Sequence, residues 1–430
     1  MPAKPAGSLL ESRVSQRRLE AEVAASGQPR IGFIALLAAL TAAGPVAMQI
    51  FLPALPLIQE GLATTPAMAQ LTLSLSMLAI AVATLVYGPL ADRYGRRPVM
   101  LAGLVLVSAG SVLCALAVNI GMLIGARLLQ AAGGAAGMVL TRAIARDRFG
   151  AAGAARVISQ LTMIMVVAPM IAPAVGGGLT DAFGWRSTFW FVAALGLVLF
   201  ALAARGLAES RPPGTVSSTP LAMLSSLPTL FGSRLFSAYV VQTAFTSMIF
   251  FSFIAGAPYV MAHMLHRPPS EYGLYYILVS GGFMIGNMLS LRIGHWFTPG
   301  VLLVAGSCIA LAGSVLLAGI IAVSALTPAW LFLPMMFGSV GNGLVMPNAQ
   351  AAAINVFPER AGAASGISGF LQMIFAATAS QLVGVLQNGT AWPMLALMLL
   401  GGGGALLATL VAVRSQPPGV PRSTVSAASG

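Results

Sequence analysis

The residues best suited to chemistry lie in the segment 88–97, which reads G-P-L-A-D-R-Y-G-R-R. One aspartate among three arginines can form ion pairs, and an aspartate beside a helix start meets the positive end of the helix dipole. The glycine that opens the segment leaves room for a second helix to approach closely. The segment therefore indicates a turn held by charges. Its candidate functional residues are Gly88, Asp92, Arg93, Gly95, Arg96 and Arg97.

A second candidate is Arg127, a lone charge inside the long apolar run 120–141. In a helix, Arg127 and Gln130 share one face, and Gly134 and Met138 continue it at the same spacing. A charge within a membrane-spanning helix marks a functional site by default, so we expect this face to line a central cavity. The alternative is that Arg127 extends its guanidinium toward the nearby outer membrane surface.

The sequence lacks the residue patterns that several other kinds of chemistry require. The chain contains neither the H-E-x-x-H pattern of zinc proteases nor the G-x-S-x-G pattern of serine hydrolases. Its single lysine, Lys4, cannot complete a phosphate-binding G-x-x-x-x-G-K-[ST] loop. Cys114 and Cys308 stand alone in apolar runs, without metal-ligand spacing. We therefore expect no enzyme, no metal site and no cofactor.

The composition places these residues in a membrane protein. Of 430 residues, 58% are hydrophobic and only 7% are charged, whereas soluble proteins carry about 25% charged residues. The apolar residues form blocks of about 20, which cross a bilayer as helices. The net charge of +12 does not indicate nucleic acid, because the basic residues stand between apolar blocks as orientation signals do. The composition predicts an all-α, polytopic protein in contact with the lipid bilayer and with no nucleic acid.

Twelve apolar blocks divide into two sets of six. They lie at 31–52, 68–90, 98–118, 120–141, 156–179, 187–205, 232–260, 271–294, 299–322, 328–352, 361–387 and 391–413. The predicted domains are an N-terminal tail (1–30), a six-helix bundle (31–205), a linker (206–229), a second six-helix bundle (230–413) and a C-terminal tail (414–430). Two six-helix halves around a polar linker are typical of transporters built from two parallel repeats.

The basic residues predict the orientation of these spans. With the N-terminus inside the cell, all of them except Arg127, Arg186 and Arg267 fall on the cytoplasmic side. The reverse orientation would place the same residues outside. We therefore expect both tails to be cytoplasmic.

With these motifs the chain resembles the major facilitator superfamily, whose members carry the 88–97 pattern between their second and third helices. Within it the chain is similar to the twelve-span drug:proton antiporters of the Bcr/CflA type (bicyclomycin and chloramphenicol resistance). The phrases that carry this narrower resemblance are F-L-P-A-L-P at 51–56, T-R-A-I-A-R-D at 141–147, G-W-R at 184–186, M-P-N-A at 346–349 and F-P-E-R-A-G at 357–362. The resemblance implies multidrug efflux from the bacterial inner membrane by alternating access, with 88–97 as a cytoplasmic gating motif.

Residues 168–178, A-P-M-I-A-P-A-V-G-G-G, resemble the antiporter signature of this superfamily, with Ala172 where a glycine is usual. The two prolines bend the helix, and the glycines allow another helix to pack closely. We expect that helix to present Gly281, Gly282 and Gly286. The candidate residues are Pro169, Pro173, Gly176 and Gly177. The resemblance favours export over import.

The chain departs from these relatives at Gln49, where drug exporters carry a protonatable carboxylate. An amide does not titrate, and no acidic residue lies deep in a predicted span. Three interpretations remain open. In the first, protons couple through Asp92 or Asp147 at the cytoplasmic edge. In the second, Arg127 modulates substrate binding without titrating. In the third, the protein is a facilitator or an exporter with unusual coupling.

The sequence thus predicts a monomeric secondary transporter that exports small amphiphilic compounds in exchange for protons. The alternative is a dedicated metabolite or amino-acid exporter, or a facilitator without carboxylate-based coupling. The candidates for the substrate cavity and for coupling are Met48, Gln49, Arg127 and Gln130. Further amides and aromatic residues that could face the cavity are Gln70, Gln160, Gln242, Asn287, Asn342, Asn348, Gln372, Phe245 and Tyr259.

Overall fold

The computed structural model describes residues 31–211, 227–323 and 325–415. The predicted tail 1–30, most of the linker 206–229 and nearly all of the tail 414–430 lie outside these ranges. Within them the fold is all helical, and twelve segments are long and apolar enough to cross a membrane. The predicted fold class and number of spans are confirmed.

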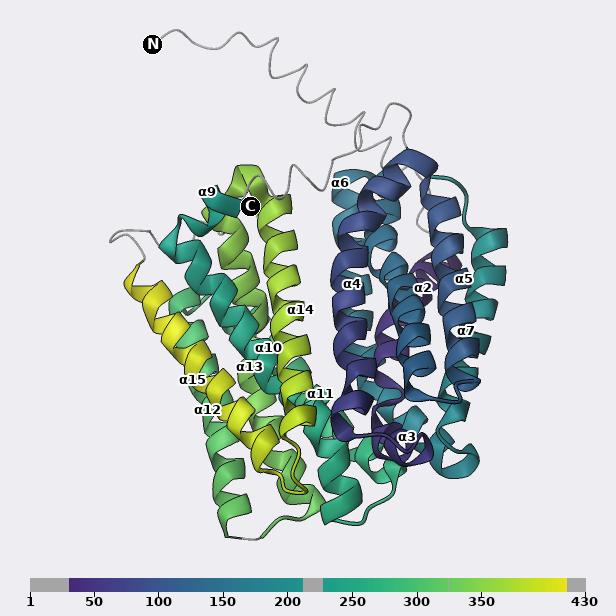
Figure 1. The fold of residues 1–430 in the computed structure, drawn as a ribbon. Helices are drawn as coiled ribbons and strands as arrows, with labels where there is room; N and C mark the ends of the chain where they lie inside the picture. Colours follow the sequence, from purple (N-terminus) through teal and green to yellow (C-terminus); the bar gives the residue numbers. More distant parts are fainter. Residues whose placement is uncertain (1–30, 212–226, 324, 416–430) are drawn as a thin grey trace, which may run out of the picture.

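Each half contributes six spans (Figure 1). The first half contains α2 (Ile31–Gln49), η1 (Leu52–Ala54), α3 (Leu55–Gly61), α4 (Pro66–Tyr94), α5 (Arg96–Ala115), α6 (Ile120–Phe183) and α7 (Arg186–Gly206). The second half contains α9 (Leu227–Phe231), α10 (Arg234–Tyr259), η2 (Val260–Met264), α11 (Pro269–Ile293), α12 (Pro299–Ala322), α13 (Pro328–Val356), η3 (Pro358–Arg360), α14 (Ala361–Leu386) and α15 (Trp392–Arg414).

Two local signals in the sequence fix where several helices begin and turn. Thr65, Thr298 and Thr327, each followed by proline, accept a hydrogen bond from the backbone N–H three residues further on. The threonine oxygen pairs an N–H that a helix start leaves free, and the proline has no N–H to leave unpaired. Within α6, Gly150 adopts φ +64° and joins the predicted spans 120–141 and 156–179 in one bent element.

The halves meet at one end of the bundle and diverge toward the other. We call the end where α2 begins and α15 ends the terminal end, and the other the closed end. Toward the closed end, Phe51 and Phe189 share one apolar core with Phe253 and Phe332 of the second half. At the terminal end each half has a core of its own. The ribbons in Figure 1 accordingly separate toward the terminal end.

Polar contacts join α4 to α14 toward the closed end. The Gln70 side-chain N–H donates to the Ser380 hydroxyl at 2.6 Å, and the Ser74 hydroxyl donates to Gln381 at 2.8 Å. Gln381 in turn donates to the carbonyl oxygen of Ala67 at 3.0 Å. These contacts cross from one half to the other, so α4 and α14 form one wall of the closed end.

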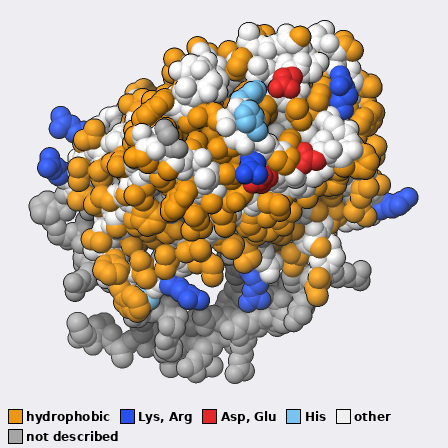
Figure 2. Space-filling view, turned by 90° about the horizontal axis from the view of Figure 1, so that it is seen from below, with side chains coloured by type: hydrophobic (Ala, Val, Ile, Leu, Met, Phe, Trp, Pro, Cys, Tyr) orange, Lys and Arg blue, Asp and Glu red, His pale blue; other side chains and the backbone are white. Residues whose placement is uncertain are grey.

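A second set of polar contacts lies at the surface of the closed end. His263 Nε2 lies 3.5 Å from Glu60 Oε1, and Asp181 accepts the backbone N–H of Ser270 at 3.1 Å. Hydrophobic side chains cover most of this face, and a few acidic, basic and histidine side chains gather near its middle (Figure 2). A few polar contacts therefore join the two halves at this face.

Backbone contact between α6 and α11 completes the closed end. A Cβ atom at Gly177 would lie 2.7 Å from the Cα of Ser270. Gly273 of α11 likewise lies against the backbone of Pro173. Carbon atoms at optimal separation lie about 3.5–4 Å apart, so no larger side chain fits at Gly177 without separating the halves.

The prediction that α6 packs against Gly281, Gly282 and Gly286 was wrong. A Cβ at Gly282 or Gly286 would meet the backbone of α13, and Gly281 has no neighbour within 4 Å. The α6 contact lies nearer the start of α11, at Gly273. The reason is that, in the described residues, the backbones of α6 and α11 meet near the closed end, where α11 begins.

We expect Gly177→Ala to force the closed end apart, because its methyl group would overlap the backbone of Ser270. Gly178→Ala is the matched control, since Gly178 has no neighbour within 4 Å. Spin labels at Val118 and Val323, which are exposed beside the closed-end ends of α5 and α12, report the separation of the halves in a chain without its native cysteines. The distance should lengthen only in Gly177→Ala, and an equal distance in both variants would contradict the assignment.

Candidate functional site

A cavity of about 220 Å³ lies between the halves. It is lined by Gln49, Met165, Val166, Pro169, Thr246, Phe250, Phe251, Ser280, Phe283, Asn342, Met346, Gln372 and Met373. Thioethers and phenyl rings make up much of its wall, and amides and hydroxyls supply the polar groups. None of these lining residues is charged, so the cavity suits molecules that carry apolar groups and few charges.

Gln49 connects the two halves at the cavity wall. Its side-chain oxygen accepts a hydrogen bond from the Tyr276 hydroxyl at 2.8 Å. Gln49 is 8% exposed, so this bond is shielded from bulk water. Its neighbour Met48, predicted for the same cavity, is partly buried against the apolar cores and is not among the lining residues.

Arg127 lies inside the first half, away from the cavity. Its guanidinium donates to the carbonyl oxygens of Ala47 at 2.9 Å and Thr72 at 3.3 Å and also to Gln130. The guanidinium carbon lies 4.0 Å from the centre of the Phe51 ring. Arg127 is 1% exposed and has no carboxylate partner among the described residues. It therefore ties α6 to α2 and α4 from within.

Gln130 extends this network. It accepts from Arg127 and donates to the Ser111 hydroxyl of α5 at 2.7 Å. Arg127 and Gln130 thus lie together on one helical face, as their spacing predicts, but that face is enclosed by α2, α4 and α5. Because Ala47 lies two residues before Gln49 on α2, the network holds the backbone that carries Gln49 at the cavity.

The sequence identified part of the cavity wall and missed the rest. Of the further amides it singled out, Asn342 and Gln372 line the cavity, whereas Gln70 joins α4 to α14. The apolar lining residues that sequence reasoning did not single out are Met165, Val166, Phe250, Phe251, Phe283, Met346 and Met373. No pattern in one sequence separates them from other apolar residues, because lipid-facing, core and cavity positions in a span are all apolar.

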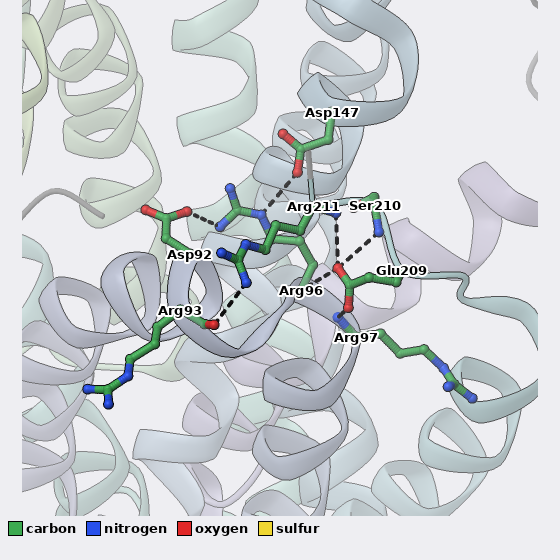
Figure 3. Close-up of polar contacts among 8 residues, drawn as sticks. All are labelled: Asp92, Arg93, Arg96, Arg97, Asp147, Glu209, Ser210 and Arg211. Carbon is green, nitrogen blue, oxygen red and sulfur yellow. Dashed lines mark hydrogen bonds and ion pairs between the residues drawn. The ribbon is translucent and has the colours of Figure 1, made fainter. Parts of the chain in front are cut away.

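At the terminal end, Arg96 lies between two carboxylates. Its guanidinium contacts Asp92 at 2.6 Å and Asp147 at 3.0 Å, as Figure 3 shows. The three side chains are between 9% and 15% exposed, which limits solvent screening of the pairs. Asp92 and Arg96 belong to the predicted motif, and Asp147 comes from α6. We call these three residues the Arg96 cluster.

Glu209, which follows α7, binds the start of α5 beside this cluster. Its carboxylate accepts the backbone N–H groups of Arg96 at 2.9 Å and Arg97 at 3.2 Å, and those of Ser210 and Arg211 at 3.0 Å (Figure 3). Partial burial raises the pKa of Glu209, but the four N–H donors, of Arg211, Arg96, Arg97 and Ser210, outweigh it and lower the pKa below the usual value. Sequence reasoning missed this residue.

Gly95 is required by the same geometry. Its φ is +103°, a conformation that residues with a Cβ rarely adopt, and a Cβ there would lie 2.5 Å from Glu209 Oε2. Arg93 accepts from the Arg211 side chain through its carbonyl oxygen at 2.9 Å, and Arg97 donates to the carbonyl of Ala204 at 2.8 Å. The motif is therefore bound within the first half and its own linker.

The predicted motif residues of α6 divide between two neighbours. Pro169 lines the cavity, and Pro173 and Gly177 lie against α11. Gly176 packs against the backbone of Ile50, next to Gln49 on α2. The α6 motif thus lies between the cavity and the contact that closes one end of it.

Two six-helix halves that enclose a central cavity and part at one end define a membrane transporter. The chain belongs to the Major Facilitator Superfamily, whose family model matches residues 35–380. With twelve spans and bacterial relatives, it is a multi-pass protein of the inner membrane.

The relatives include an uncharacterized transporter and two proteins named for multidrug resistance. The chain is 29% identical over 387 residues to YdgK of Bacillus subtilis, an uncharacterized MFS-type transporter, which covers 87% of this chain and 94% of that protein. It is 29% identical to the multidrug resistance protein MdtL of Escherichia coli, and the match covers 88% of this chain and 93% of that protein. It is 28% identical to multidrug resistance protein D of Escherichia coli, and the match covers 87% of this chain and 94% of that protein.

Solved structures share the fold. A D-xylose–proton symporter matches with a TM-score of 0.69 at 15% identity, covering 90% of this chain and 98% of that one. An inward-facing bacterial homologue of the human lysosomal transporter Spinster matches with a TM-score of 0.66 at 15% identity, covering 89% and 94%. These likenesses establish the architecture alone.

Glu209→Gln should lower the free energy of unfolding at neutral pH. In acid the variant and the unmodified protein should be equally stable. A carboxyl whose folded pKa lies below its unfolded value, about 4.3 for glutamate, stabilises the fold above that value. The contribution is lost as the pH falls through the folded pKa. Because Glu209 is exposed, we expect a loss below about 1 kcal/mol. Thermal unfolding of purified protein between neutral pH and about pH 3 measures it, because the folded pKa lies below about 4.3.

The control for this variant is Glu359→Gln, an exposed glutamate at the terminal end of the second half. It should leave the unfolding temperature unchanged across the same range. A Glu209→Gln difference that grows as the pH falls would contradict the assigned role of the four N–H donors.

Arg127→Ala should destabilise the first half strongly, because the carbonyls of Ala47 and Thr72 lose their donor in a buried site. Removing a buried charged donor costs on the order of 3 kcal/mol. Arg148→Ala is the control, since Arg148 also lies over a phenyl ring, that of Phe33, but is exposed. We expect a loss below about 1 kcal/mol there. Equal losses in thermal unfolding would refute a structural role for Arg127.

Proposed function

We propose that this chain exports small amphiphilic compounds, drugs and antibiotics among them, from the bacterial cytoplasm in exchange for protons. The observation that carries the proposal is the cavity between the halves, with its thioethers, phenyl rings and amides and no charged lining residue. Such a surface binds varied apolar molecules, because methionine side chains adapt to irregular shapes. One chain completes the cavity, in keeping with a monomer.

The distribution of charge supports a cytoplasmic position for the terminal end. Basic residues including Arg93, Arg97, Arg142 and Arg146 lie on this side of the spans, where the positive-inside rule places them in the cytoplasm. The halves diverge toward this end. In this orientation the structure is the state that takes up a compound from the cytoplasm, with its exit closed.

The relatives named as multidrug resistance proteins support the drug class, and the α6 motif supports export. Together with the phrases in 51–56, 141–147 and 357–362, they favour the Bcr/CflA type of antiporter.

Release to the outside requires the closed end to part and the terminal end to close. The contacts at the closed end are hydrogen bonds such as Gln70–Ser380 and an exposed His263–Glu60 pair, which separate at modest cost. At the terminal end Gly88 has no neighbour within 4 Å in this state. Since α4 already contacts α14 at the closed end, closure would bring α14 toward Gly88. This is the proposed gating role of the 88–97 motif.

The proton-binding groups we propose are Asp92 and Asp147. They are carboxylates in a largely buried cluster, and they share one arginine, Arg96. A proton on either one would weaken its hold on Arg96, which links protonation to the packing of α4 against α6. Gln49 cannot serve, because its amide does not titrate.

One observation favours the alternative, a facilitator or dedicated metabolite exporter. The position at which related exporters carry a carboxylate holds Gln49, and its oxygen is bound to Tyr276. A cavity without a titratable acid has no internal group through which a proton could compete with the substrate.

The test is the accumulation of a panel of antibiotics and dyes in efflux-deficient bacteria that express this chain. We expect accumulation to fall severalfold and a protonophore to restore it. Asp92→Asn and Asp147→Asn should abolish most of this effect, whereas Glu359→Gln, an acid at the same end outside the cluster, should retain it.

The outcomes separate the two functions. Export that ignores the protonophore and both aspartate variants would favour the facilitator. No change for any compound, with the protein confirmed in the membrane, would contradict drug export and favour a dedicated metabolite carrier.

A further inference from the structure

Asn342 is a buried amide at the cavity whose hydrogen-bonding groups are unused. It lies in the middle of α13, lines the cavity and is 2% exposed. Neither its side-chain oxygen nor its nitrogen has a hydrogen-bond partner among the described residues. Leaving a buried amide unpaired costs roughly 1–3 kcal/mol. A group at this position that enters the cavity and pairs with it would recover that free energy.

The side-chain oxygens of Gln49, Thr246 and Gln372, which also line the cavity, already take part in hydrogen bonds. The oxygen of Gln49 accepts from Tyr276, and the hydroxyl of Thr246 donates to a carbonyl of its own helix at 2.9 Å. Gln372 accepts from Gln350 at 3.2 Å and donates to the sulfur of Met346 at 3.4 Å. Asn342 is therefore the lining amide that offers a donor and an acceptor together.

The rest of the wall disfavours charge. The lining residues carry no formal charge, and Arg127 is enclosed in the first half, where α2 and α4 bind it. An ion that enters the cavity would lose hydration without gaining a counter-ion. A neutral molecule loses less and gains contact with Phe250, Phe283 and Met373.

We propose that Asn342 is the polar anchor of the substrate, and that substrates are uncharged molecules with an amide or lactam group beside an apolar ring. An amide presents an N–H and a carbonyl side by side, which match the oxygen and nitrogen of Asn342. This inference names the substrate class of the exporter proposed above and rests on that function. It assigns Asn342 as a residue that determines specificity.

The test uses two probes of nearly equal size, 2-naphthamide and 2-acetylnaphthalene, whose methyl group replaces the amide NH₂. Equilibrium dialysis against the purified full-length protein gives each Kd. We expect the amide to bind roughly tenfold more tightly than the ketone, because the ketone leaves the Asn342 oxygen unpaired. Asn342→Leu, of similar volume, should remove this preference.

The matched control is Asn287→Leu on α11, because the Asn287 side chain donates to the carbonyl of Phe283 on its own helix and does not line the cavity. It should keep the tenfold preference. Asn342→Asp supplies a gain of function that a misfolded protein cannot imitate. It should bind the cationic probe 2-naphthyltrimethylammonium, which the unmodified protein should not bind, because a carboxylate supplies the missing counter-ion.

Equal binding of amide and ketone, binding of neither, or a preference that survives Asn342→Leu would each overturn the inference. The accumulation assay is independent of these probes. Drug export with no amide preference would leave the proposed function standing and remove Asn342 as its anchor. Amide binding without export would contradict the proposed function and leave Asn342 as a residue that binds amides.

Discussion

The arrangement depends on the backbone contact between α6 and α11 at the closed end. At Gly177 and Gly273 the two helices approach more closely than any side chain allows, and the apolar cores of both halves merge around that contact. The attraction is short-ranged, so it holds the halves together only where the surfaces fit. The cavity, its closed side and its opening toward the terminal end all follow from having this contact at one end.

The terminal end is organised by charge instead of by packing between halves. Arg96 is bound by two carboxylates of the first half, and Glu209 binds the start of α5 through backbone N–H groups. These bonds keep the 88–97 turn intact while the halves are apart. The turn therefore stays ordered without the second half, and Gly88 leaves a surface on which another helix can settle.

Two polar side chains inside the spans illustrate how a membrane protein uses polarity. Arg127 donates to two backbone carbonyls and to Gln130, while its other terminal nitrogen has no partner among the described residues, and it braces three helices around Phe51. Asn342 is equally buried and unbonded. In a medium of low polarity the first arrangement stabilises a scaffold, and the second favours a ligand that supplies the missing bonds.

The sequence by itself determined the all-helical class, the twelve spans and the chemistry of the 88–97 turn. These follow from local properties: apolar length, the arginines that stand between apolar blocks, and glycine at positions such as Gly95. Only the tertiary structure decided that Arg127 faces its own half, that Glu209 binds the turn, that Gly273 meets α6, and which apolar residues line the cavity. Those outcomes depend on how helices rotate and tilt against one another, and a span that is apolar on every face does not encode its own rotation.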